Sequence, residues 1–388
     1  MNVRMTDVVT TFDPFAYFAE LRSGGPVVRR DNVWLALSHQ SCKRVLLDHS
    51  SFSSAPLNSV DGVAGPQLSM LSTDPPVHAR YRSATSHAFS HSRVMAMHPT
   101  FTRTARSLTR TLGEGPELEV MAGLAEPLAR AAIAAMVGVP EADRASFTRW
   151  CPAVMAVAGR GTRPQATAED ETAVGELKEY LRHALRSNTV HPDLLLGALG
   201  ADQREGRITE DEAVSIAVAV LVGGIGTTAH LIGNALVALL EHEAVYDAVL
   251  IDRGLMPRAL DETARHSPPV LAIPRWSRSD TVLEGQTIRA GSVVLAVIGS
   301  ANRAPDVFSE GWRFDIHRRG APGLAFGHGA HGCPGRGMAL DVARTALEAL
   351  LDRYPTLTPA SSAWMKREAS LFVYGPKTAH VRVGERRP

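Results

Sequence analysis

Apolar residues recur at helical spacing along most of the chain, and a few short stretches alternate as strands do. The helical pattern covers residues 13–21, 39–47, 78–89, 92–112, 124–137, 141–157, 168–186, 193–199, 209–241, 257–266 and 337–354. Strands are predicted at 27–28 with 33–37, at 273–276, 282–283, 286–288 and 293–297, and as a terminal hairpin of 370–374 with 380–383. We therefore expect one domain over 1–388 that is mainly α with a small β subdomain, its β-rich parts being about 26–38, 270–298 and 370–384.

The predicted helix over 209–241 is long and unusually apolar. Residues 213–240 contain no Asp, Glu, Lys or Arg, and such a helix could in principle cross a bilayer. It also carries Thr227, Thr228, His230 and Asn234, and acidic residues flank both of its ends, where a membrane span usually has basic or aromatic anchors. We interpret it as a buried helix at the centre of the domain, beginning at a capping box of Thr209 and Glu212, and we expect no membrane partner.

Composition narrows the class of protein further. Hydrophobic residues make up 45% of the 388 positions, and 41 Lys and Arg stand against 40 Asp and Glu. A nucleic-acid partner is not expected, because such proteins need a surplus of basic charge. Three isolated cysteines, Cys42, Cys151 and Cys333, argue against a disulfide scaffold or a zinc finger. The N-terminus lacks an apolar signal segment, so a cytoplasmic location is predicted.

The strongest chemical signal is the glycine-rich loop over residues 326–335, which delivers Cys333 to the start of a helix. Amide groups and the dipole at a helix N-terminus favour a thiolate over a thiol, and a thiolate is what an axial ligand of haem iron requires. A lone cysteine is more often a small core residue. The spacing of Phe326, Gly329, Cys333 and Gly335 favours the ligand instead.

This loop resembles the haem-binding segment of the cytochrome P-450 family, and the resemblance extends from about residue 13 to residue 383. It implies the cytochrome P-450 fold, with haem b (iron protoporphyrin IX) held between the long central helix and the cysteine loop. Glu262 and Arg265 resemble the family's Glu-x-x-Arg, which implies a buried network with an arginine of a later loop, here Arg318.

The resemblance also implies four donors to the haem propionates. The stretch 74–82 resembles the family's Asp-Pro-Pro-x-His-x-x-x-Arg, which assigns His78 and Arg82 to the propionates. These two residues lie one helical turn apart and can face the same anion. Arg275 and His331 match the remaining two donors.

The long helix departs from the family pattern at one position. Residues 223–228 resemble the family's small-residue groove followed by an acid and an alcohol, which implies that Gly223 opens the groove and that Thr227 and Thr228 supply hydroxyl groups for proton delivery to dioxygen. The acid position is occupied by Gly226. The usual carboxylate of the proton relay is therefore missing.

Three functions stay open. The first is a monooxygenase that uses O2 and electrons from a ferredoxin and ferredoxin reductase to oxidise a small hydrophobic or aromatic natural product, as in secondary metabolism. The second is oxidative radical C–C or C–N coupling of aromatic substrates, such as indole-containing cyclic dipeptides, without oxygen insertion. The third is a non-catalytic haem sensor, against which Thr227 and an apolar pocket argue. The resemblance implies that the pocket is lined by the loop over 50–72, the residues that follow 78–89, the groove face of the long helix, 270–273 and 371–372.

Overall fold

The computed structural model describes residues 13–56, 70–113, 115–158, 166–361, 363–369 and 372–384. Its helices are α1 (Pro14–Ser23), α2 (His39–Leu47), α3 (Val77–Ser86), α4 (His91–Thr111), α5 (Glu126–Val137), α6 (Arg144–Ala158), α7 (Ala168–Ser187), α8 (Leu195–Arg204), α9 (Glu210–Glu241), α10 (Glu243–Ile251), α11 (Met256–His266), α12 (Ile298–Ala301) and α13 (Arg336–Arg353). Its strands are β1 (Val27–Arg30), β2 (Val33–Ala36), β3 (Phe52–Ser53), β4 (Glu117–Glu119), β5 (Ile273–Ser277), β6 (Thr281–Leu283), β7 (Gln286–Ile288), β8 (Val293–Ala296), β9 (Leu357–Pro359), β10 (Met365–Ala369) and β11 (Tyr374–Val383).

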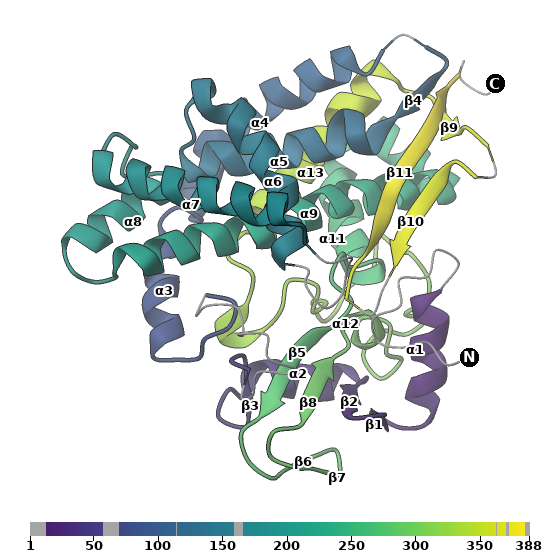
Figure 1. The fold of residues 1–388 in the computed structure, drawn as a ribbon. Helices are drawn as coiled ribbons and strands as arrows, with labels where there is room; N and C mark the ends of the chain where they lie inside the picture. The colour runs from purple at the N-terminus through teal and green to yellow at the C-terminus, as the bar shows by residue number, and fades with distance from the viewer. Residues whose placement is uncertain are drawn as a thin grey trace.

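The long helix α9 runs through the middle of the helical body, with α5, α6, α7, α8, α11 and α13 packed around it (Figure 1). It is the one helix of the described residues that is long and apolar enough to cross a membrane, and 61% of its most apolar stretch is buried inside the protein. A helix that is apolar on all sides is stable in water only inside a large core. The prediction of a buried central helix is confirmed, as is the capping box of Thr209 and Glu212 at its start.

The β structure forms three small sheets. The largest has the strand order β1-β2-β8-β5-β3 and lies with α1 and α2 at the opposite end of the molecule from most of the helices (Figure 1). A second sheet joins β10, β11, β4 and β9, and β6 pairs with β7 as a hairpin. The mainly α fold with a small β component is confirmed.

Two sequence-based predictions are wrong in detail. The described hairpin is formed by Met365–Ala369 and Tyr374–Val383, because β11 continues through Gly375 and Pro376 while it pairs with three other strands. Residues 370 and 371 of the predicted hairpin lie outside the described residues. Helix α10 was not predicted, because His242 alone separates it from α9 and no glycine or proline marks the break. Most of residues 50–72, which the resemblance places on the pocket wall, fall outside the described residues.

Candidate active site

An apolar cavity of about 280 Å³ lies between α9 and the cysteine loop. Cys333 is on its wall, and so are Gly223, Gly224, Thr227 and Thr228 of α9. Most of the other lining side chains are aliphatic or aromatic, and they include Met70, Leu71, Phe89, Ile133, Val220, Val270, Ile273, Phe326 and Met338. The fold thus brings the predicted cysteine and the predicted groove of the long helix to one cavity.

The cysteine loop owes its shape to glycines and to backbone hydrogen bonds. The Cys333 amide donates to the Phe326 carbonyl at 2.7 Å, and the Gly327 amide donates to Leu324 at 2.9 Å. Gly327 has a φ of 72° and Gly329 a φ of 69°, values that side chains disfavour. A Cβ at Gly329 would also lie 3.1 Å from the Leu46 carbonyl oxygen of α2. The loop is therefore a tight turn that directs the Cys333 side chain into the cavity.

The electrostatic surroundings of Cys333 act in opposite directions. Cys333 is exposed and lines the cavity, and partial desolvation of its sulfur raises the pKa of the thiol. The backbone amides of Gly335 and Arg336, together with the charges of Arg82 and Arg336, lower the pKa of the same thiol. Burial is the largest effect. The pKa of the free thiol is therefore raised overall, and a metal bound to the sulfur would favour the thiolate instead.

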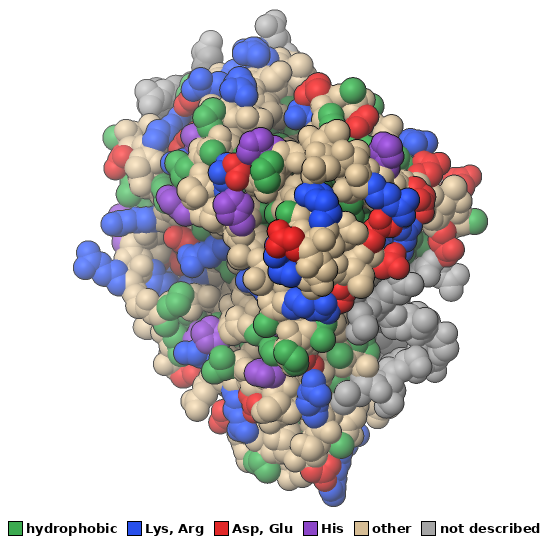
Figure 2. All heavy atoms as spheres, turned by 90° about the vertical axis from the view of Figure 1, so that its left-hand side faces the viewer, with side chains coloured by type: hydrophobic (Ala, Val, Ile, Leu, Met, Phe, Trp, Pro, Cys, Tyr) green, Lys and Arg blue, Asp and Glu red, His purple; other side chains and the backbone are tan. Residues whose placement is uncertain are grey.

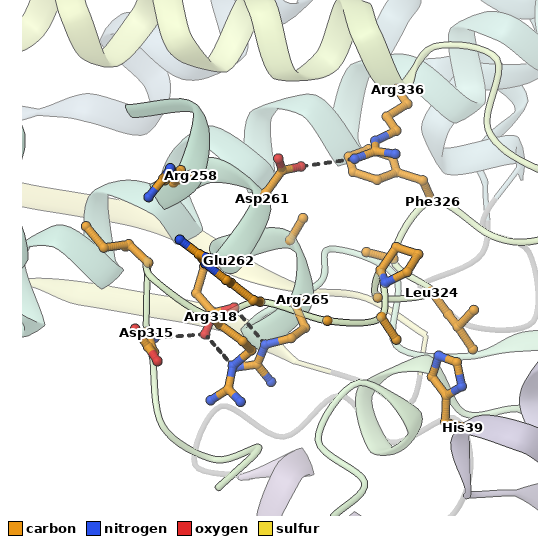
Figure 3. Close-up of a pocket in the computed structure, with 18 of the residues that line it drawn as sticks. His39, Arg258, Asp261, Glu262, Arg265, Asp315, Arg318, Leu324, Phe326 and Arg336 are labelled. Atoms are coloured by element: carbon orange, nitrogen blue, oxygen red, sulfur yellow. Dashed lines mark hydrogen bonds and ion pairs between the residues drawn. The ribbon is translucent and has the colours of Figure 1, made fainter. Parts of the chain in front are cut away.

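A buried ionic network supports the loop from behind. Glu262 accepts two hydrogen bonds from the Arg265 guanidinium, each at 2.7 Å, and one from the Asp315 amide at 2.8 Å. Arg318 Nε lies 3.4 Å from Glu262 Oε1, so the predicted third partner is confirmed (Figure 3). Arg265 also donates to the carbonyls of Asn302, Gly311 and Arg313, which fixes the segment that leads into the cysteine loop.

The four predicted propionate donors lie close enough to interact with one another or with Cys333, and His331 lines the cavity. The rings of His78 and His331 stack with centroids 3.8 Å apart. Burial, the largest effect, together with nearby arginine charges lowers the pKa of His78 to about 4, and burial with the charge of His78 lowers the pKa of His331 to about 3. Burial lowers the pKa of Arg275 to about 10 and lowers that of Arg82, whose charge interacts with Cys333. The buried Nδ1 of His78 has no hydrogen-bond partner among the described residues.

Three residues beside these donors were missed by the sequence analysis. Asp74 accepts hydrogen bonds from the Ser54 amide at 2.9 Å and from Arg278 Nη2 at 2.5 Å. The Ser54 hydroxyl lies 3.0 Å from Nε2 of His331, which is 277 positions away in the sequence. Asp74 stands in the motif that predicted His78 and Arg82. No sequence signal connects Ser54 with His331, because only the tertiary fold brings them together.

The α9 wall differs from the expectation at one residue. The Thr227 hydroxyl donates to the Gly223 carbonyl at 2.6 Å, and both residues line the cavity together with Thr228. A Cβ at Gly223 would meet no atom within 4 Å, so this glycine does leave open space. A Cβ at Gly226 would instead lie 3.4 Å from Cε of Met155 in α6. Gly226 therefore faces a neighbouring helix.

A second, larger cavity of about 590 Å³ shares residues 325–327 of the loop with the first one but has charged walls, including Lys43, Arg258 and Arg336 (Figure 3). Cys333 does not line it, so we regard the smaller apolar cavity as the candidate active site. On the face over α3, α7 and α8, basic, acidic and histidine side chains are interspersed (Figure 2). Such a mixed surface agrees with the near-neutral net charge.

Comparisons with known proteins decide the family. The sequence profile of the family described as Cytochrome P450 matches residues 170–383. The chain is 34% identical to the cytochrome P450 monooxygenase PikC of Streptomyces venezuelae, over 91% of this chain and 87% of PikC. The chain belongs to the cytochrome P450 family. It is a cytochrome P450 monooxygenase, and the family's cofactor is a haem whose iron is bound by a cysteine thiolate.

Other relatives of this cytochrome P450 agree over nearly the full length. The erythromycin C-12 hydroxylase of Saccharopolyspora erythraea is 32% identical, over 95% of this chain and 94% of that protein. The crystal structure of CYP109E1 from Bacillus megaterium in complex with testosterone matches with a TM-score of 0.86 and 29% identity, over 96% of this chain and 100% of that one. The predicted fold of the family is therefore confirmed.

The residues around the apolar cavity fit a haem. The cavity offers the thiol of Cys333, and the cluster of His78, Arg82, Arg275 and His331, of which His331 lines the cavity, offers nitrogen donors. The unpartnered Nδ1 of His78 and the buried guanidinium of Arg275 need acceptors, and the two propionates of a haem are carboxylate acceptors. The thiolate would bind the iron, the apolar walls would contact the porphyrin ring, and the donor cluster would bind the propionates.

We predict that Glu262→Gln lowers the free energy of unfolding by about 3–5 kcal/mol, because it leaves the buried Arg265 charge uncompensated. Urea unfolding of the holoprotein, followed by circular dichroism, measures this change. Asp261→Asn is the matched control, since Asp261 pairs with Arg336 at 3.1 Å but both side chains are half exposed. That variant is expected to change stability by less than about 0.5 kcal/mol. Equal losses in both variants would contradict the role given to Glu262.

Proposed function

We propose that this cytochrome P450 binds haem b through the thiolate of Cys333 and oxidises a small hydrophobic or aromatic natural product of secondary metabolism. The observation that carries the proposal is the position of Cys333. It is the cysteine on the wall of the apolar cavity, and it shares that wall with the α9 groove. Cys42 and Cys151 are buried elsewhere, where their thiols donate to the carbonyls of Ala36 and Phe147.

The remaining cofactor contacts are assigned residue by residue. His78, Arg82, Arg275 and His331 would hold the propionates, and Phe326 and Gly335 would shape the loop around the sulfur. A Cβ at Gly335 would lie 3.9 Å from Cys333 Sγ and 3.5 Å from the Phe89 ring, so this glycine keeps the sulfur accessible. Gly223 supplies space on the α9 side.

The lining of the cavity supports a hydrophobic substrate. Met70, Leu71, Val220, Val270 and Ile273 present aliphatic side chains. A mostly apolar pocket with a few hydroxyl groups suits a compact natural product better than a charged metabolite. The names of the relatives, which include an erythromycin hydroxylase and a protein crystallised with testosterone, support a substrate with an extensive apolar surface.

When bound, the haem thiolate activates dioxygen and oxidises the substrate. The protein's own part begins with the apolar walls, which exclude bulk water and orient the substrate by contact. Thr227 is held by its hydrogen bond to the Gly223 carbonyl, so its oxygen presents lone pairs to the cavity and can accept a hydrogen bond from water. Passing a proton on requires that the hydroxyl release the carbonyl. Thr228 lines the same cavity and provides a second hydroxyl.

Electrons would reach the haem from a ferredoxin and its reductase. Arg336, the first residue of α13, is half exposed, and its guanidinium lies over the Phe326 ring at 5.4 Å. Arg103, Arg106 and Arg110 are exposed on α4, the helix that packs against α13. These cations support charge-guided docking of an acidic protein near the cysteine loop. A single domain and a cytoplasmic location, where such partners are found, complete the proposal.

Spectroscopy tests the ligand. In Cys333→Ser, the reduced carbon-monoxide complex should lose the red-shifted Soret band of thiolate-bound haem, because an alcohol does not replace the thiolate. Cys42→Ser and Cys151→Ser should keep that band. A normal thiolate spectrum in Cys333→Ser would end the assignment.

Salt dependence tests the electron donor. Turnover driven by ferredoxin should fall by roughly threefold or more between ~0.05 and ~0.5 M salt, because screening weakens charge-guided docking, while turnover driven by peroxide should change little. Arg336→Ala should weaken the salt dependence. Arg289→Ala is the control, since Arg289 forms an exposed ion pair on the β6–β7 hairpin. Equal salt responses of the two assays would argue against this docking mode.

Isotope labelling separates oxygen insertion from radical coupling. We expect product formed under heavy dioxygen to carry the label.

Thr227→Ala should raise peroxide release and lower the product per electron by roughly tenfold or more, because a hydroxyl of the proton path is lost. Thr172→Ala removes a similar hydroxyl bond to the carbonyl four residues earlier, in α7, and should have no effect. An unlabelled, dimeric product would favour radical coupling. The missing carboxylate at Gly226 is compatible with that reaction.

A further inference from the structure

The hydrogen bond between Ser54 and His331 joins the end of β3 to the cysteine loop. Ser54 Oγ lies 3.0 Å from His331 Nε2, and the serine is buried, with 4% of its surface exposed. A neutral imidazole has one N–H, so His331 can donate from Nδ1 to a propionate only in the tautomer in which the Ser54 hydroxyl donates to Nε2. In that tautomer the bond restrains the rotation of the imidazole about its side-chain torsion.

Ser54 itself is fixed by Asp74. The Asp74 carboxylate accepts the Ser54 amide at 2.9 Å, the Ser53 hydroxyl at 2.5 Å and Arg278 Nη2 at 2.5 Å. The carboxylate is buried, and the Arg278 charge compensates it, so it does not repel an anion nearby. The backbone of Ser54 therefore has little freedom, and its hydroxyl is delivered to a defined position.

The partner ring is restrained on a second side. His331 stacks on His78 with an angle of 29° between the ring planes, and His78 is 1% exposed. The amide of His78 donates to the Asp74 carbonyl at 3.0 Å. Asp74 thus positions Ser54 through its side chain and His78 through its backbone. Both imidazoles are held next to Arg275, whose charge affects each of them.

We propose that Ser54 is a positioning residue for the cofactor: its hydroxyl holds the His331 ring in the orientation in which it donates to a haem propionate. The inference rests on the proposed function, in which Cys333 binds the haem and His331 contacts the propionates. The Thr73 backbone and the stacked His78 ring also hold His331, but without Ser54 the ring loses its restraint at Nε2 and can turn away from the carboxylate. The propionate charge is then less compensated, which favours ferric over ferrous haem and weakens the hold on the cofactor.

The experiment measures two properties of the holoprotein besides its activity. Ser54→Ala should release haem to an excess of apomyoglobin about tenfold faster. This is the effect expected when the hydrogen bond from His331 to an ionised propionate is lost. Its haem reduction potential, from spectroelectrochemical titration, should become more negative. Ser54→Thr keeps the hydroxyl and should restore both values toward those of the unmodified protein.

Ser53→Ala is the matched control. Ser53 bonds the same carboxylate from the neighbouring position and is equally buried, but its hydroxyl does not contact His331. It should leave the potential and the rate of haem loss close to the original values. If Ser54→Ala does not accumulate as folded protein, Ser54→Cys keeps the volume with a weak donor and serves the same comparison.

A double-mutant cycle tests whether Ser54 acts through His331. His331→Phe keeps a ring that stacks on His78 but has no nitrogen, so adding Ser54→Ala to it should change neither measurement further. Equal effects of Ser54→Ala in both backgrounds, or equal effects of Ser54→Ala and Ser53→Ala, would overturn the proposal. Failure of the proposed function would look different, because the unmodified protein would then lack the spectrum of thiolate-bound haem.

Discussion

The buried carboxylate of Glu262 is the centre of the hydrogen-bond network that positions the cysteine loop. It fixes Arg265, and Arg265 in turn donates to the Asn302 carbonyl at 2.8 Å. The Asn302 side chain then accepts the Leu324 amide at 2.6 Å. From Leu324 the chain of bonds continues through the Gly327 and Cys333 amides to the sulfur-bearing residue. The desolvation of the two charges offsets most of the free energy that a buried ion pair gains, whereas removal of one partner leaves the other charge buried and uncompensated. Such a network therefore fixes one conformation and adds little net stability.

The candidate site combines two opposite environments in a small space. The Cys333 side and the α9 wall are apolar, which raises the pKa of the thiol, whereas the edge with His78, Arg82, Arg275 and His331 concentrates donors. A ligand without acidic groups would leave the donors of the second environment without acceptors. A flat molecule with an apolar body, a metal for the sulfur and acidic groups at one edge satisfies both, and this is the reason why the site fits the family's cofactor.

Much of this arrangement could be predicted from the sequence where the signal is local. The capping box of Thr209, the hairpin of β1 and β2, and the Glu262–Arg265 pair all depend on residues within one or two turns of each other. The family resemblance added Arg318, which no periodicity would have found. The signals that failed are those set by distant partners. Ser54 meets His331 across 277 positions, and β11 runs through Gly375 and Pro376 because its neighbours in the sheet and α9 require it.

The sequence also could not show which neighbour a side chain at position 226 would face. The sequence indicates only that a carboxylate is absent, and the packing of α6 decides that the position faces Met155. Helical spacing gives the face of a residue relative to its own helix, but not which neighbour covers that face. The surroundings of position 226 are therefore set by the α6–α9 contact as much as by the α9 sequence.

The strand order of the largest sheet has a consequence for synthesis. β2 pairs in parallel with β8, so Val33 finds Val293 as its neighbour only after nearly all of the helical body has been made. At roughly 5–20 residues per second, the ribosome leaves the edge of the β1–β2 hairpin unpaired for tens of seconds. Exposed strand edges attract other chains. The edge of β2 thus stays open to pairing with other chains until β8 emerges.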